Sequence, residues 1–97
     1  MLPPMPVARF TRHLTRFFPA LDAVGGEPVT GATVAEVLVD LDQRHPGLRA
    51  YLVDDTGHLR RHVNIFRNGS MLLDRRGLTD SVDDEDELLI VQALSGG

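Results

Sequence analysis

The sequence contains no cysteine and no tryptophan, and because all ten basic residues are arginine it contains no lysine either. Without thiols, the chain has no cysteine nucleophile and cannot form disulfides, iron–sulfur clusters or thiolate zinc sites. Without lysine, it offers no ε-amine that could accept an isopeptide bond. These absences exclude thiol-based chemistry and lysine-linked attachment of one copy to another.

The 97 residues carry a formal net charge of −4, and 42% of them are hydrophobic. This length and composition are typical of one globular domain. A mildly acidic chain lacks the basic face that nucleic-acid binding needs. The longest run of large apolar residues, Leu88–Val91, is too short to span a bilayer, and the first residues show no secretory signal. We therefore expect a cytoplasmic protein that binds neither nucleic acid nor membrane.

One amphipathic helix is clearly indicated after residue 33. Thr33 and Glu36 have the spacing of a capping box, in which both side chains satisfy free backbone groups at a helix start. Arg44 marks the expected end, because a His-Pro-Gly sequence follows it. The apolar residues between these points recur at helical spacing and form one stripe: Val34, Val37, Leu38 and Leu41.

The remaining signals are those of β-strands. Ala8 and Phe10 alternate with polar residues, Val29-Thr30 precedes a glycine, and Asn68-Gly69 is a strong hairpin signal after the β-rich segment 62–67. Glu87–Ala93 is expected to be the last strand. The six acidic residues from 80 to 87 are interpreted as a solvated turn before it. This order predicts an α+β fold, with a mixed sheet of four to five strands and one main helix on one face. Residues 1–93 would form a single domain, and 94–97 a flexible tail.

The two faces of this sheet are expected to differ. Alternation places Val63, Ile65, Leu88 and Ile90 on the face that meets the helix. It leaves Phe66, Leu89 and Val91 on the open face, because one helix of this length covers only one side. Solvent-facing apolar clusters often mark docking sites. The alternative is that a loop, such as the Phe17-Phe18 segment, folds over them.

Patterns that would support catalysis or metal binding are absent from the sequence. His58 and His62 have a spacing that suits a metal on a helix, but along a strand four residues span about 13 Å, too far to share one zinc ion. The acidic pairs lack the spacing of a calcium loop. We therefore expect no catalytic residues, no metal and no bound cofactor, and a protein that is not itself an enzyme.

The chain ends Leu94-Ser95-Gly96-Gly97, directly after the last expected strand. Glycines tolerate nearly any backbone angle, so a slender tail of this kind can enter a channel that side chains would block. Its α-carboxylate is ionised at neutral pH and is a poor electrophile until it is converted to a form such as an acyl-adenylate. This logic predicts a carrier of an activated acyl group.

The chain resembles the ThiS/MoaD family of ubiquitin-like (β-grasp) sulfur carriers from about Val7 to Gly97. The resemblance rests on the order of several short motifs together with the terminal Gly96-Gly97: residues 29–34, Pro46-Gly47-Leu48, residues 62–66, Asn68-Gly69, Gly77-Leu78 and Asp84–Ile90.

The resemblance implies a mechanism. A partner adenylating enzyme would use ATP to adenylate Gly97, and a sulfur donor would convert the adenylate to a thiocarboxylate for a sulfur-accepting biosynthetic enzyme. Ser95 and Gly96 would form the slender tail, and partners would dock on the apolar face of Phe66, Leu89 and Val91. The pathway would be cofactor synthesis of the molybdopterin or thiamin kind, or the synthesis of cysteine or another small molecule.

Two positions depart from the family pattern. Gln92 stands where a proline is frequent, which is expected to loosen the root of the tail, and Glu85 stands where a glycine is frequent, which suggests a reshaped loop. Two alternatives to a sulfur carrier are a ubiquitin-like modifier conjugated through Gly97 and a β-grasp interaction module that is not conjugated.

Overall fold

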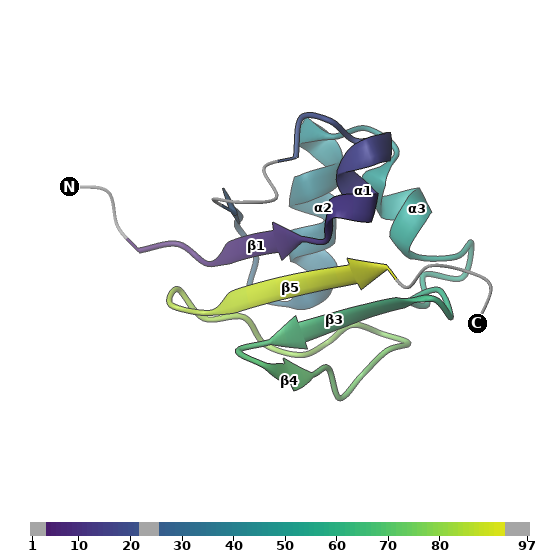
Figure 1. The fold of residues 1–97 in the computed structure, drawn as a ribbon. Coiled ribbons are helices and arrows are strands. Elements are labelled where there is room, and N and C mark those ends of the chain that lie inside the picture. The colour runs from purple at the N-terminus through teal and green to yellow at the C-terminus, as the bar shows by residue number, and fades with distance from the viewer. Residues whose placement is uncertain (1–3, 22–25, 93–97) are drawn as a thin grey trace.

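The computed structural model describes residues 4–21 and 26–92. Within these residues, five strands and three helices follow one another (Figure 1). Their bounds are β1 (Val7–Phe10), α1 (Arg12–Phe17), β2 (Glu27–Pro28), α2 (Val34–Arg44), α3 (Leu48–Leu52), β3 (Val63–Arg67), β4 (Ser70–Met71) and β5 (Glu87–Gln92).

The strands form one mixed sheet in the order β2-β1-β5-β3-β4 (Figure 1). β5 is parallel to β1 and antiparallel to β3, while the two outer pairs, β1–β2 and β3–β4, are antiparallel. This confirms the predicted mixed sheet. The strand nearest the C-terminus is therefore the central one, with neighbours on both sides.

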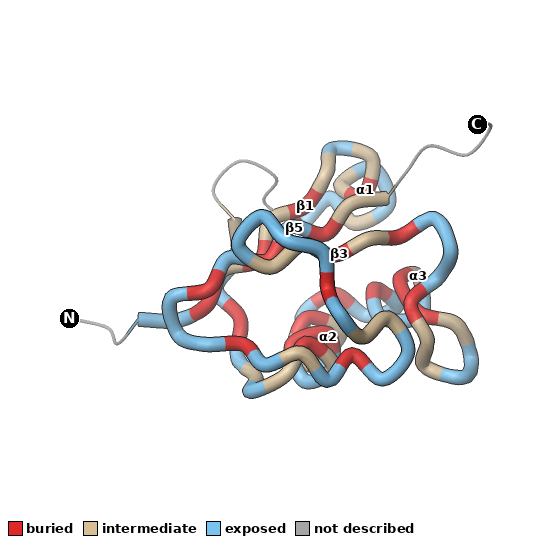
Figure 2. Tube along the Cα trace, turned by 90° about the horizontal axis from the view of Figure 1, so that it is seen from below, coloured by how far each residue is buried: buried red, intermediate tan, exposed pale blue. Residues whose placement is uncertain are grey.

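The predicted main helix is confirmed as α2. The Thr33 hydroxyl accepts a hydrogen bond from the Glu36 N–H at 3.3 Å, and the Glu36 carboxylate accepts one from the Ala32 N–H at 3.3 Å. The first of these bonds satisfies a backbone donor that the first helical turn leaves free, and in the second the Glu36 side chain reaches back to the residue just before the N-cap Thr33. The four apolar residues at helical spacing in α2 are buried. Figure 2 shows α2 and α3 on one side of the strands. The core lies between these two layers.

Three local features differ from the expectations. The second strand is Glu27–Pro28 instead of Val29-Thr30; Val29 is buried, and its N–H donates to the carbonyl of Pro6 at 2.9 Å. Two short helices were not predicted. α1 has six residues and buries only Leu14, so it leaves almost no periodic signal. α3 starts after Gly47, whose left-handed φ of 96° redirects the chain instead of ending the helical region.

Candidate functional site

The expected functional centre is the tail that follows β5, and the structure defines its root. Ser95, Gly96 and Gly97 lie outside the described residues, as does the predicted domain boundary at residue 93. Gln92 is the last described residue. Its N–H donates to the Thr11 hydroxyl at 3.4 Å, and its side-chain amide donates to the Tyr51 hydroxyl at 2.9 Å. Gln92 is thereby joined to Thr11, the N-cap of α1 directly after β1, and to Tyr51 of α3.

The strand register brings four apolar side chains together on the open face of the sheet. Phe66 of β3 pairs with Leu89 of β5 on one side and with Met71 of β4 on the other. Val91 lies on the same face, because it is two residues beyond Leu89. Leu89 is 38% exposed and Met71 52% exposed, while Phe66 and Val91 are half-buried. We call these four residues the apolar stripe.

The predicted division between the two faces is confirmed. The inward-facing residues Val63, Ile65, Leu88 and Ile90 are all buried in the core. The alternative that Phe17 and Phe18 cover the open face is wrong, because both rings pack against Tyr51 of α3, at centroid distances of 5.4 and 5.7 Å.

Sequence reasoning missed Met71, although a signal was present. A two-residue Asn-Gly turn pairs the residues on either side of it, here Arg67 with Ser70. The next pair outward is then Phe66 with Met71. The hairpin motif alone was therefore sufficient to add Met71 to the open face.

A polar rim bounds the apolar stripe where β5 begins. A shallow hollow at this end is lined by Phe66, Asn68, Gly69, Glu87 and Leu89. Arg9, the register partner of Leu89 on β1, donates to the Glu87 carboxylate at 2.9 Å. An apolar centre with a polar edge is the usual anatomy of a protein–protein interface.

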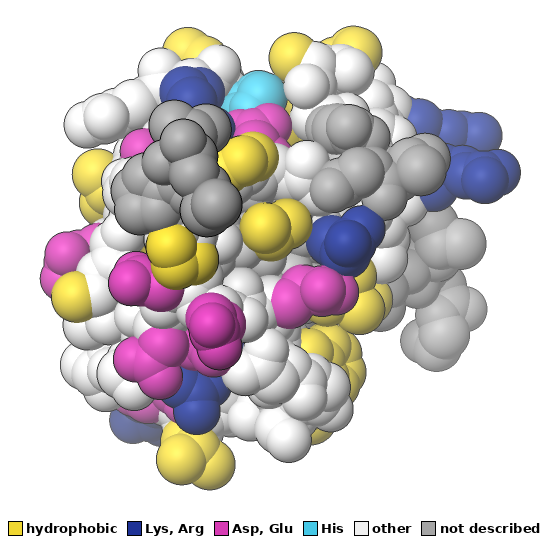
Figure 3. Space-filling model, turned by 90° about the vertical axis from the view of Figure 1, so that its left-hand side faces the viewer, with side chains coloured by type: hydrophobic (Ala, Val, Ile, Leu, Met, Phe, Trp, Pro, Cys, Tyr) yellow, Lys and Arg dark blue, Asp and Glu magenta, His cyan; other side chains and the backbone are white. Residues whose placement is uncertain are grey.

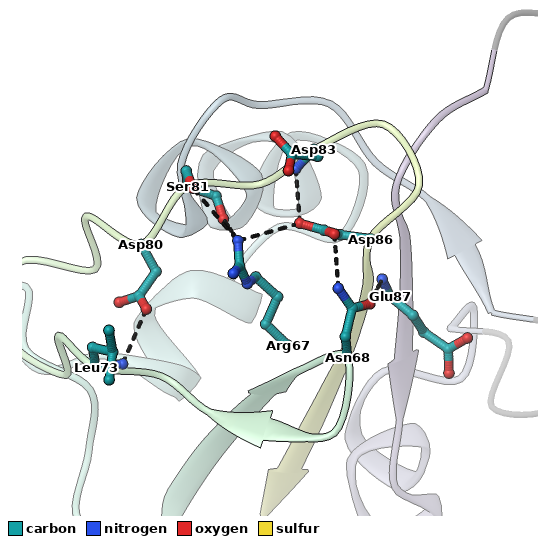
Figure 4. Close-up of polar contacts among 8 residues, drawn as sticks. All are labelled: Arg67, Asn68, Leu73, Asp80, Ser81, Asp83, Asp86 and Glu87. Atoms are coloured by element: carbon teal, nitrogen blue, oxygen red, sulfur yellow. Dashed lines mark hydrogen bonds and ion pairs between the residues drawn. The ribbon is translucent and has the colours of Figure 1, made fainter.

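The β3–β4 turn is fixed to the start of β5 by a polar network (Figure 4). Asn68 has a left-handed φ of 50°, which asparagine tolerates better than most residues. Its side-chain oxygen accepts from the Glu87 N–H at 2.9 Å, and its amide donates to the Asp86 carboxylate at 2.8 Å. The hairpin that carries Phe66 and Met71 is thereby held in register with the strand that carries Leu89.

Asp86 is the hub of this network, and it is buried, unlike the solvated turn expected for residues 80–87. Its buried carboxylate accepts the Asp83 N–H at 2.8 Å and faces the Arg67 guanidinium at 3.5 Å. The hydrogen bond from Asp83, then that from Asn68 and the charge of Arg67, hold the pKa of Asp86 below its usual value although burial opposes this. Glu85, in the same turn, does not have a positive φ, so the position does not require the glycine that is frequent in the family.

Replacing Asp86 by asparagine is expected to reduce stability in a pH-dependent way. An amide retains one acceptor but presents its NH2 group to donors, which at neutral pH costs roughly 1–3 kcal/mol. Because the pKa of Asp86 is lowered by folding, its stabilising effect is present above the ordinary value of about 3.9 and is lost as pH falls below it. Urea unfolding at pH 7 should separate wild type from D86N. An equal gap at about pH 2 would contradict this role.

No group of three or more histidine or acidic side chains in residues 4–21 and 26–92 could hold a metal ion. None of the helices in this described part is long and apolar enough to cross a membrane. What the described part of the chain does present is the apolar stripe with its polar rim, on a sheet whose central strand ends at Gln92.

Comparison with known proteins agrees with this architecture. The ThiS family matches residues 16–97. Small archaeal modifier protein 3 of Haloferax volcanii is 33% identical over 66 residues, covering 68% of this chain and 71% of that protein. The sulfur carrier protein CysO of Mycobacterium tuberculosis is 33% identical over 70 residues, covering 70% and 75%.

The solved structures confirm the ubiquitin-like β-grasp fold. The BexX/CysO complex of Amycolatopsis orientalis contains a chain that superposes with a TM-score of 0.78 at 29% identity, over 95% of this chain and 99% of that chain. CysO of M. tuberculosis superposes with a TM-score of 0.76 over 92% and 99%. The protein therefore belongs to the ThiS family of small ubiquitin-like proteins, whose members are carriers or modifiers instead of enzymes.

Proposed function

We propose that this protein is a sulfur carrier whose Gly97 carboxylate is adenylated and then converted to a thiocarboxylate. The observation that carries the proposal is the position of β5. This central strand ends at Gln92, which is tied on two sides, and the sequence continues from there to Gly96-Gly97. A rigid root followed by a glycine end suits a carboxylate that another protein must reach.

The chemistry requires two steps, both on a partner enzyme. The Gly97 carboxylate attacks the α-phosphorus of ATP, which releases pyrophosphate and leaves an acyl-adenylate. A sulfide equivalent from a sulfur donor then attacks the acyl carbon, the C–O bond to the phosphate breaks, and AMP leaves. The product is a thiocarboxylate, which passes its sulfur to a biosynthetic enzyme. The carrier itself binds no cofactor, and the ATP belongs to the partner.

The apolar stripe supplies the docking surface in this proposal. Its centre, where Phe66 lies between Leu89 and Met71, is on the same sheet face as Val91, one residue before the tail root. A partner seated on the stripe is therefore close to the tail. The BexX/CysO complex is a precedent for a carrier of this kind in contact with another protein. We place the reaction in the cytoplasm, where ATP and the biosynthetic enzymes are present.

Intact-mass measurement tests the proposal. The chain with a free C-terminus is incubated with ATP, an adenylating enzyme from the same host and a sulfide source. Exchange of one oxygen for one sulfur atom, lost when ATP is omitted, is the expected result. An unchanged mass with every adenylating enzyme of the host would refute it.

A second function, conjugation to other proteins, is favoured by the similarity to the archaeal modifier proteins. In that case a lysine amine of a target attacks the same adenylate and AMP leaves. Because this chain has no lysine, each target lysine would carry a single copy. Covalent adducts in the same experiment would support this function, whereas neither product would favour an interaction module that is not conjugated.

A further inference from the structure

We propose that three arginines beside the tail root form a second contact with the adenylating enzyme, and that they fit an acidic surface around the channel that receives the tail. The three are Arg12 and Arg16 of α1, and Arg61, which lies just before β3; we call them the tail-root arginines. This inference rests on the proposed function and adds to it a surface outside the apolar stripe.

The topology brings these arginines to the tail root from both sides. β1 runs parallel to β5, so α1, which follows β1, begins at the end where β5 finishes. Arg12 and Arg16 line a hollow there together with Thr11, His13 and Gln92. On the other side of β5, Val63, the first residue of β3, pairs with Gln92. Arg61 lies two residues before Val63, at the same end of the sheet as the tail root.

The guanidinium groups of these arginines make no ion pair with the described residues. All three residues are exposed. Three other arginines form ion pairs: Arg9 with Glu87, Arg44 with Glu27 and Asp40, and Arg67 with Asp86. Two more, Arg60 and Arg75, donate hydrogen bonds to backbone carbonyls. In contrast, no side-chain hydrogen bond or ion pair joins a tail-root arginine to any residue in the ranges 4–21 and 26–92. A cluster of like charge that has no partner among the described residues of an acidic protein is suited to binding an acidic partner.

The molecule is also electrically polarised along β5. The acidic turn Asp83–Asp86 lies at the start of this strand, and the tail root lies at its end, about 20 Å away for six extended residues. Figure 3 shows the end of the molecule at which β1 and β5 begin, where acidic side chains gather. An acidic surface would attract the tail end and repel the opposite one, so that the tail arrives first.

The reach of the tail decides which part of the enzyme meets these arginines. Five residues follow Gln92, and five residues span at most about 17 Å when fully extended. With the Gly97 carboxylate at the ATP, the tail root must lie within that distance of the active site. The arginines therefore face the protein surface at the mouth of the channel. The surface that these arginines contact is an acidic rim around the channel. The length of the tail keeps them away from the α-phosphate of ATP.

The experiment compares two variants of equal net charge. R12Q/R16Q removes two charges beside the tail root, while V39E/Q43E adds two negative charges on the exposed side of α2. R12K/R16K restores the charge without the guanidinium shape. Association with the immobilised adenylating enzyme is measured by surface plasmon resonance at about 20 mM and about 500 mM salt, where screening of exposed charges differs strongly.

We expect R12Q/R16Q to associate about five- to tenfold more slowly than V39E/Q43E at low salt, with the difference nearly lost at high salt. R12K/R16K should associate at the wild-type rate. Equal rates for R12Q/R16Q and V39E/Q43E would overturn the inference and leave the proposed function intact, provided that wild type is still adenylated. Failure of wild type to be adenylated would overturn both. Tight binding of a single-stranded oligonucleotide that is lost in R12Q/R16Q alone would assign the arginines to nucleic acid instead.

Discussion

Deletion of Gly97 should abolish thiocarboxylate formation completely and leave the fold intact. The reacting carboxylate would then be that of Gly96, one residue short of its position in the partner's active site. Adenylation requires the carboxylate oxygen and the α-phosphorus of ATP to meet in line, and a misplacement of even 1 Å can cost about a hundredfold in rate. A tail shortened by a whole residue, about 3.4 Å when extended, should therefore be inactive.

The control for this deletion is Ser95→Ala, which changes the tail but keeps its length and its terminal glycine. Both chains should unfold at the same urea concentration, because β5 ends at Gln92, five residues before the deleted glycine. Intact mass after incubation with ATP, the adenylating enzyme and sulfide should show sulfur on S95A only. Sulfur on the shortened chain would mean that the end of the tail is not positioned by its length.

Much of the fold could be predicted because its longer helix and strands repeat apolar residues at the spacing of their secondary structure. α2 combines a capping pair with apolar residues at helical spacing over eleven residues, and β3 and β5 alternate between a buried and an open face. The elements that were missed are short, and tertiary contacts hold them. α1 depends on Leu14, and α3 on Leu48 and Leu52 packing into the core. Such elements leave too little local signal for sequence reasoning.

The residues of the candidate site also fall into a predictable and an unpredictable group. Phe66, Leu89 and Val91 could be assigned to the open face from strand period alone, whereas the tail-root arginines could not be found. Arg12 and Arg61 are 49 positions apart in the sequence, and only the order β1-β5-β3 brings their strands to the same end of β5. Predicting that juxtaposition would require the parallel pairing of β1 with β5, which no single residue encodes.

Phe66→Asp should weaken binding to the adenylating enzyme by tenfold or more. Phe66 lies at the centre of the apolar stripe, between Leu89 and Met71, and buried aromatic residues at the centre of an interface dominate its binding energy. A carboxylate there would be desolvated by the partner without a cation to pair with it. A tenfold change in Kd corresponds to about 1.4 kcal/mol, which is at the lower end for such positions.

The matched control is Val39→Asp, which places the same charge on an exposed apolar residue of α2, in the layer behind the sheet. Both variants lower the net charge by one, so a general electrostatic effect would weaken both equally. Isothermal titration with the adenylating enzyme should show weaker binding for F66D only, while urea unfolding confirms that each variant is folded. Binding of F66D at wild-type strength would remove the open face from the interface, and the tail with its flanking arginines would have to supply the contact by themselves.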